Sequence, residues 1–245
     1  MRVRAVGDHS VYHGGCRAVW EVLTNALSAN GGRIVGDDSD YDVLVVNGEG
    51  NMHHGSAGCR RKIAAIEAAL REGRAAYLVN TVWQENPPDF DDLLKRCASI
   101  SVREIMSRDE LAERHGVQST ICLDYSYFAP APEDERGADF RGEEAETDYF
   151  SAEHGDFRPF PESAAYGGRA PFSLKDGRWP RLVASLRTAS LLVTGRQHAV
   201  YAACRARTPF AAIEGNTHKI RGLIKTSGID IPVAEKPEEL PAIID

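Results

Sequence analysis

Cysteine is scarce in this sequence. The 245 residues include five cysteines, which are scattered along the chain and form no Cys-x-x-Cys pair. An odd number of dispersed thiols predicts neither a disulfide framework nor a zinc knuckle. No run approaches the roughly 20 apolar residues of a membrane span, and the first residues lack the apolar stretch of a signal peptide. We therefore expect a protein of the reducing cytoplasm.

Several catalytic signatures are also missing. The chain has no Gly-x-Ser-x-Gly elbow, no Walker A loop and no His-Glu-x-x-His motif, which removes the commonest hydrolase and kinase interpretations. The net charge of −7 argues against non-specific binding to nucleic acid or to an anionic membrane. The length allows one large domain or two small ones, each with its own core.

Apolar runs alternate with helical patterns through residues 1–129. This alternation predicts an N-terminal α/β domain with a mostly parallel sheet. Strands are predicted at 2–6, 42–48, 75–83, 99–104 and 119–126, and helices at 16–32, 59–72, 90–98 and 107–116.

The composition changes from Pro130 onward, and the alternation of strand and helix patterns stops. Residues 133–156 hold ten acidic residues against two arginines, with few aliphatics, so we expect an acidic linker or surface insertion over 130–178. Regular patterns return at 179–245, with helices predicted at 179–190, 198–207 and 218–228 and strands at 191–195 and 209–215. They predict a second, smaller α/β domain. Two such domains side by side would leave a cleft between the carboxyl ends of their strands.

Polar residues cluster where four predicted strands end. Ligands of open α/β sheets bind beyond the carboxyl ends of the strands, so this clustering predicts an active site. The four segments are 7–15, 47–54, 103–104 and 195–198.

Arg196 and His198 are the most suggestive pair in these segments. An arginine offers a rigid fork for a carboxylate or a phosphate. A histidine two residues further on can exchange a proton near neutral pH. The alternative is an exposed arginine followed by a histidine that caps the next helix.

The other segments leave alternatives open. Gly48-Glu49-Gly50 is either a turn or a phosphate cradle. His53 and His54 are adjacent and expected to point apart, and no third ligand has suitable spacing, so we expect no metal site.

The roles of Arg103, Asp124 and Lys219 are equally open. Arg103 can be interpreted in two ways: it clamps an anion together with Ser107, or it pairs with a nearby carboxylate. Asp124 is either a site residue or an N-cap or turn residue. Lys219 either faces the cleft or is a surface lysine.

Taken in order, these segments resemble the polysaccharide pyruvyl transferase family. The resemblance covers most of the chain outside residues 130–178, and it depends on the ordered set rather than on one motif. The matching segments are His13-Gly14-Gly15-Cys16-Arg17-Ala18, Asn47-Gly48-Glu49-Gly50, Val102-Arg103-Glu104-Ile105-Met106-Ser107, Cys122-Leu123-Asp124, Arg196-Gln197-His198-Ala199, Arg207-Thr208-Pro209 and Lys219-Ile220-Arg221-Gly222.

The resemblance implies two Rossmann-like halves in a GT-B-like arrangement, with the second half shortened. It also implies transfer of the pyruvyl group of phosphoenolpyruvate (PEP) to a saccharide hydroxyl as a ketal. We expect no cofactor and no metal. The catalytic residues would be His198, as general acid, and Arg196. The donor-binding residues would be Arg103, Ser107 and Lys219. The acceptor-binding residues would be Asp8, His13, Gly14, Gly15, Asn47, Gly48, Glu49, Gly50 and Asn51.

Some points stay open within the resemblance. Asp8 or Glu49 would deprotonate the acceptor hydroxyl, and nothing in the sequence chooses between them. Thr208 stands where the family has glycine, which indicates an altered donor site. Two rival functions remain: a GT-B glycosyltransferase that uses a nucleotide-activated sugar, and a non-catalytic protein that binds a saccharide or an anion.

Overall fold

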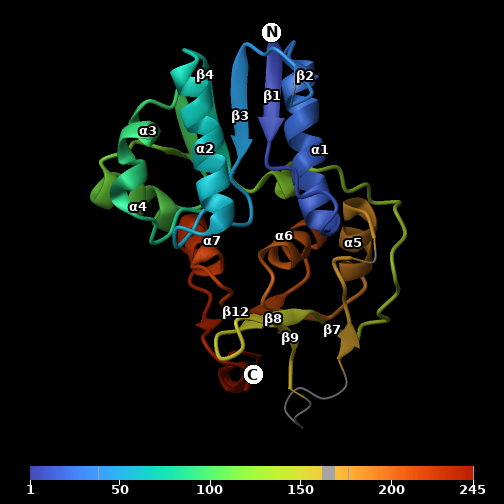
Figure 1. Cartoon of the computed structure of the whole chain (residues 1–245). Coiled ribbons are helices and arrows are strands. Elements are labelled where there is room, and N and C mark those ends of the chain that lie inside the picture. The colour runs from blue at the N-terminus through green and yellow to red at the C-terminus, as the bar shows by residue number, and fades with distance from the viewer. Residues whose placement is uncertain (38, 162–168, 176, 245) are drawn as a thin grey trace. The chain divides into compact units, whose positions relative to one another are not determined.

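The computed structural model describes residues 1–37, 39–161, 169–175 and 177–244 (Figure 1). The chain forms two compact units. Unit 1 comprises Met1–His9 and Trp20–Tyr125, and unit 2 comprises Ser10–Val19 and Ser126–Asp245. The first helix, α1 (Gly14–Ala29), contributes its first turns to unit 2 and the rest to unit 1.

Unit 1 contains a six-stranded sheet in which every pair of neighbouring strands is parallel. Its order is β2 (Arg33–Val35), β1 (Arg2–Val6), β3 (Val43–Asn47), β4 (Ala75–Thr81), β5 (Ser99–Val102) and β6 (Thr120–Ile121). The predicted α/β domain with a parallel sheet is confirmed. Only β2 escaped the sequence analysis, because three residues are too few to show a periodic pattern.

Helices cover both faces of this sheet because β3 alternates its side chains between two cores. Leu44 and Val46 pack in a cluster with Ile63 and Ile66 of α2 (Ala57–Arg71), which lies along β3 and β4 (Figure 1). Val45 packs with Leu23 of α1 in a second cluster. The remaining helical segments of unit 1 are a 3₁₀ turn at Pro88–Phe90, α3 (Asp91–Lys95) and α4 (Ile105–His115).

Unit 2 contains a five-stranded parallel sheet and a separate antiparallel hairpin. The sheet order is β10 (Ala170–Pro171), β7 (Glu144–Glu146), β11 (Leu191–Thr194), β12 (Phe210–Ile213) and β13 (Val233–Ala234). The hairpin consists of β8 (Asp148–Ser151) and β9 (Asp156–Pro159). The helical segments are a 3₁₀ turn at Tyr125–Phe128, α5 (Trp179–Leu186), α6 (Gln197–Ala206), α7 (Lys219–Ser227), a 3₁₀ turn at Pro237–Glu239 and α8 (Pro241–Ile244).

The expected acidic linker differs from the structure. Strand β7 lies inside it and pairs with β11, so the larger segment of unit 2 begins at Ser126 rather than at residue 179. Ala145 at the centre of β7 is fully buried. The sequence analysis missed this short strand because Glu144 and Glu146 flank its one apolar residue. In the structure both carboxylates pair with Arg169, Glu144 at 2.6 Å and Glu146 at 4.0 Å. Residues 162–168 and 176 of the expected linker lie outside the described residues.

The position of Thr208 gives a physical reason for one departure from the family pattern. Its buried hydroxyl donates to the carbonyl of Leu186 at 2.6 Å, which ties the end of α5 to the turn after α6. Arg207, with φ of 62°, supplies the left-handed residue that ends α6. In the described part of the chain, no helix is long and apolar enough to cross a membrane.

Candidate functional site

Polar residues gather at the carboxyl edge of the unit 1 sheet. Gly7 follows β1, Asn47 ends β3, Thr81 ends β4 and Arg103 follows β5. Asn47, Thr81 and Arg103 are buried, with at most 3% of their surface exposed. Buried polar groups need hydrogen-bond partners, so these positions must form a defined network.

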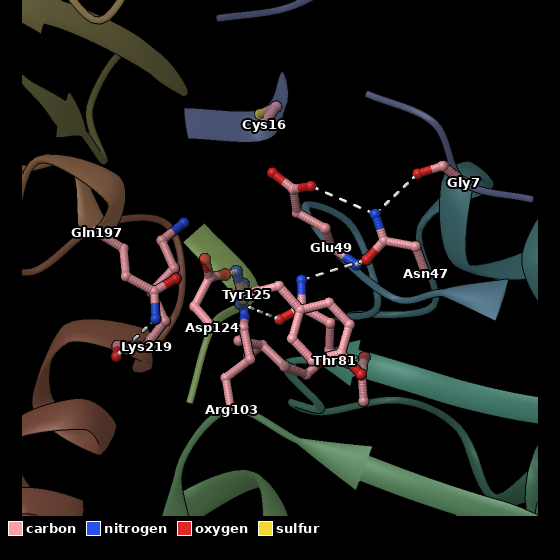
Figure 2. Close-up of polar contacts among 12 residues, drawn as sticks. Gly7, Cys16, Asn47, Glu49, Thr81, Arg103, Asp124, Tyr125, Gln197 and Lys219 are labelled. Carbon is pink, nitrogen blue, oxygen red and sulfur yellow. Dashed lines mark hydrogen bonds and ion pairs between the residues drawn. The ribbon is translucent and has the colours of Figure 1, made fainter. Parts of the chain in front are cut away.

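Asn47 is the centre of this network. Its side-chain amide donates to the carbonyl of Gly7 at 3.0 Å and to Glu49 Oε2 at 3.4 Å (Figure 2). Its side-chain oxygen accepts from the backbone amide of Glu49 and from Asn80 Nδ2, both at 3.3 Å. One side chain therefore ties together the loops after β1 and β3 and the end of β4.

Gly48 makes the turn after β3 possible. A Cβ atom at this position would lie 2.3 Å from Cβ of Thr81, and the Gly48 amide donates to the carbonyl of Val79 at 2.7 Å. The chain therefore passes against β4 at a distance that only glycine allows. The Gly48-Glu49-Gly50 segment is at least a tight turn, and a phosphate-binding role for it stays a prediction.

Lys62 is a buried cation that the sequence analysis missed. Its Nζ donates to the carbonyl of Glu49 at 2.7 Å, and only 7% of the residue is exposed. Burial lowers the pKa of Lys62 to about 8, against the opposing attraction of Glu49. A lysine in a helix that carries many charged residues is usually solvent-exposed, so the sequence offered no signal that this one faces inward.

Arg103 is held by Asp124. The Arg103 Nη1 atom lies 2.5 Å from Asp124 Oδ2, and the two side chains are 3% and 0% exposed (Figure 2). Of the two alternatives for Arg103, the structure supports its pairing with a carboxylate, which is that of Asp124. A donor-binding role for Arg103 stays a prediction. It requires a ligand that shares Arg103 with Asp124 or displaces Asp124 from it.

Ser107 takes part in the N-terminal cap of α4. The Glu104 carboxylate accepts from the backbone amides of Met106 at 2.6 Å and Ser107 at 3.0 Å, and it also contacts the Ser107 hydroxyl. The same hydroxyl accepts from the backbone amide of Trp83 at 2.7 Å. These contacts give Ser107 a structural role, and its donor-binding role stays a prediction that they do not support.

The other predicted residues of this edge differ in exposure and in contacts. Asp8 is exposed and Glu49 is buried. The backbone carbonyl of Asn51 accepts a hydrogen bond from the Ser56 hydroxyl at 2.6 Å. The expectation that His53 and His54 point apart is wrong, because their Nδ1 atoms lie 2.8 Å apart. The backbone of His54 adopts a left-handed φ of 52°.

Arg196 lies at the carboxyl edge of the unit 2 sheet. Its Nε and Nη2 atoms donate to the two carboxylate oxygens of Asp148, both at 2.5 Å, and its guanidinium carbon lies 3.4 Å from the ring centroid of Phe157. Burial alone would lower the pKa of Arg196, but the hydrogen bonds and charge of Asp148 outweigh burial and raise it. The arginine is 16% exposed, so the exposed-arginine alternative is wrong.

A cavity of about 290 Å³ opens beside Arg196 within unit 2. Tyr12, Lys175, Phe157 and Asp148 contribute to its lining together with Arg196. Glu146 and Phe172 also line it, so the cavity holds two cations, two carboxylates and three Phe or Tyr rings. Cations together with aromatic rings suit a small anionic or sugar-like ligand, provided that Asp148 shares or releases Arg196. Asp148 and Phe157, like the hairpin that carries them, were not predicted, because they fall in the acidic segment.

His198 lies in the first turn of α6 and is 8% exposed. The N-cap position of α6 is occupied by Arg196 and not by His198, so the interpretation of His198 as the N-cap residue is wrong. The His198 ring lies edge-on to His13, with ring centroids 5.0 Å apart. The structure therefore brings together His13, Gly15 and His198, which the sequence analysis selected from distant segments.

His13 and Gly14 have defined backbone contacts. His13 Nδ1 accepts from the backbone amides of Gly15 at 3.1 Å and Cys16 at 3.2 Å, while the Gly14 amide donates to the carbonyl of Leu174 at 2.9 Å. His13 thus caps the first turn of α1. The acceptor-binding roles of His13, Gly14 and Gly15 stay predictions.

Lys219 begins α7. Its Nζ donates to Asn216 Oδ1 at 2.7 Å, and its carbonyl accepts from Gln197 Nε2 at 3.4 Å (Figure 2). The second contact links the starts of α6 and α7. The half-buried Lys219 is therefore not a plain surface lysine, and its donor-binding role stays a prediction.

Comparison with known proteins identifies the family. The family model described as polysaccharide pyruvyl transferase matches residues 8–217, which is most of the chain. The protein belongs to the polysaccharide pyruvyl transferase family, and this membership indicates a transferase.

One solved structure similar to the chain is that of a functionally uncharacterised protein from Klebsiella pneumoniae. It aligns with a TM-score of 0.62 at 11% identity, over 94% of this chain and 89% of the other. At this identity the similarity concerns the fold alone. No curated protein sequence matches the chain.

Proposed function

We propose that the protein transfers the pyruvyl group of PEP to a saccharide as a ketal. The observation that carries the proposal is the end of β11, where Arg196 borders a cavity and buried His198 follows in the first turn of α6. Family membership supports the same reaction class. The GT-B-like arrangement, with two Rossmann-like units that share one active site, stays a prediction.

Arg196 is proposed to hold an anionic group of the donor. Its guanidinium already binds a carboxylate, Asp148, through both Nε and Nη2, and the carboxylate of PEP has the same shape and charge. Lys175 lines the same cavity and adds a second positive charge. Arg103 and Lys219 complete the proposed set of donor-binding cations.

His198 is proposed to be the general acid. It donates a proton to the methylene carbon of PEP, which becomes a methyl group, and the neighbouring carbon accepts the oxygen of a saccharide hydroxyl. Phosphate then leaves with its C–O bond electrons, and a second hydroxyl closes the ketal. The two saccharide hydroxyls release two protons. One replaces the proton that His198 gave to the methyl group, and the other goes to the released phosphate. Imidazole suits the proton transfer because it can change its charge near neutral pH.

The reaction can be followed directly with PEP carrying ¹³C at its methylene carbon. With a saccharide acceptor, we expect the vinyl carbon signal to be replaced by a ketal methyl signal, with one inorganic phosphate released per methyl group. We expect His198→Ala to abolish this conversion while PEP binding persists. Full turnover by His198→Ala would show that another residue is the acid.

The same incubations with UDP-, GDP- and CMP-sugars provide the control for donor identity. Glycosyl transfer from one of them, without any reaction of PEP, would contradict the proposal and identify the protein as a glycosyltransferase.

A further inference from the structure

Three metal-ligating side chains meet in unit 2. His13 precedes α1, Cys16 lies in its first turn, and His198 lies in the first turn of α6. One ligand atom from each of them lies within 4.8 Å of the others. Cys16 and His198 are buried, at 4% and 8% exposure, and His13 is half-buried. Two imidazoles and a thiol are the donor set that borderline and soft divalent cations prefer.

The distance between the Cys16 and His13 ligand atoms suits a metal ion. Cys16 Sγ lies 3.4 Å from His13 Nε2. Around a tetrahedral zinc ion, Zn–S bonds of about 2.3 Å and Zn–N bonds of about 2.0 Å place sulfur and nitrogen roughly 3.6 Å apart. The two side chains therefore need to separate only slightly to share an ion.

Gly15 allows His198 to approach this pair. A Cβ atom at position 15 would lie 2.7 Å from both Cβ and Cγ of His198 and 3.1 Å from Cε1 of His13. The Cβ atom of any other residue would clash with His198 and crowd His13. The glycine thus brings the start of α1 against the start of α6 at the point where the three ligands meet.

We propose that His13, Cys16 and His198 bind a thiophilic divalent cation of the zinc class, with a fourth position open to solvent or to another ligand. Binding releases the Cys16 thiol proton, because the thiolate is the ligand. It also moves the His13 proton from Nε2 to Nδ1. The Nδ1 contacts with the amides of Gly15 and Cys16, at 3.1 and 3.2 Å, are then lost.

This site has a consequence for the proposed reaction. A metal ion on the His198 ring occupies a nitrogen that the general acid needs for its proton. Zinc therefore inhibits transfer if the proposed function is correct. Binding itself does not depend on the identity of the donor, so the two proposals can fail separately.

Cobalt(II) titration tests the site without any substrate. Bound at Cys16, Co²⁺ gives a thiolate-to-metal charge-transfer band in the near ultraviolet, together with the intense visible bands of a tetrahedral ion. We expect both to saturate at one equivalent and to disappear on addition of Zn²⁺. Cys16→Ser should lose the charge-transfer band, whereas Cys204→Ser, which removes an exposed thiol on α6, should keep it.

His13→Ala and His198→Ala should each weaken Co²⁺ binding at least tenfold, with circular dichroism confirming that the variants are folded. X-ray absorption of the zinc-loaded wild type adds a measurement that needs no variant, and we expect one sulfur and two imidazole scatterers. No charge-transfer band in the wild type, a band that survives in Cys16→Ser, or a zinc shell without sulfur would overturn the proposal.

Discussion

The ion pair between Arg196 and Asp148 decides how a ligand reaches the proposed donor site. Both guanidinium contacts at 2.5 Å go to one carboxylate, and Phe157 stacks on the same group. An incoming carboxylate or phosphate must therefore displace Asp148 or share Arg196 with it. If the proposed donor site is correct, Asp148 competes with the donor for Arg196.

Asp148→Asn should tighten PEP binding by about fivefold to tenfold, because a neutral amide competes less well for the guanidinium than a carboxylate. Isothermal titration calorimetry measures the change. Asp156→Asn is the matched control, since Asp156 lies on the same hairpin but pairs with the exposed Arg158. Weaker binding in Asp148→Asn would show instead that Asp148 orients Arg196 for the donor.

At the residue level, the sequence predicted positions better than partners. Arg196 and His198 follow an apolar strand, and this placement alone marked them. Their neighbours could not be predicted: Asp148 and Phe157 lie within an acidic segment, and Cys16 lies in a distant helix. The same holds for Lys62, which lies on a charged helix and contacts Glu49. Each reaches its partner through tertiary packing, which leaves no local pattern.

At the scale of elements, long helices and buried strands were predicted well, and short strands were not. The β3 segment is a continuous apolar run, as expected of a buried parallel strand. Strand β7 contains one apolar residue, Ala145, between Glu144 and Glu146, so its pattern resembled a solvated linker. Pairing with β11 and burial of the small side chain decided its structure.

Ala145→Asp tests whether the acidic segment belongs to the fold. The new carboxylate would be buried between two strands, and we expect a loss of at least about 2 kcal/mol of unfolding free energy. Urea unfolding measures this loss. Ala152→Asp places the same charge at an exposed site after β8 and should change stability by less than about 0.5 kcal/mol. Equal effects of the two substitutions would mean that β7 is not part of the core.

At the scale of the whole molecule, the buried Lys62 couples stability to pH. Its pKa is about 8 in the folded protein and near 10.5 when exposed. Below pH 8 both states are protonated and the folded state carries the full penalty, on the order of 3 kcal/mol. As the pH rises from about 8 toward 10.5, the unfolded chain binds more protons, so this contribution increases stability.

Lys62→Met should remove that dependence. The difference in unfolding free energy between wild type and Lys62→Met should grow in favour of the wild type by roughly 2 to 3 kcal/mol between pH 7 and pH 10. Denaturant unfolding at several pH values measures it. Lys95→Met, which removes an exposed lysine of α3, should run parallel to the wild type. Parallel curves for Lys62→Met would show that Lys62 keeps an ordinary pKa.

The central claim is that this chain binds PEP through Arg196, and calorimetric titration with PEP tests it most directly because no acceptor is needed. We expect saturable binding to the wild type, retained in His198→Ala and in Arg158→Ala, and weakened at least tenfold in Arg196→Ala. Saturable binding of a UDP-, GDP- or CMP-sugar with no heat from PEP would contradict the account. The fold and family assignments would remain, but the proposed donor would be wrong.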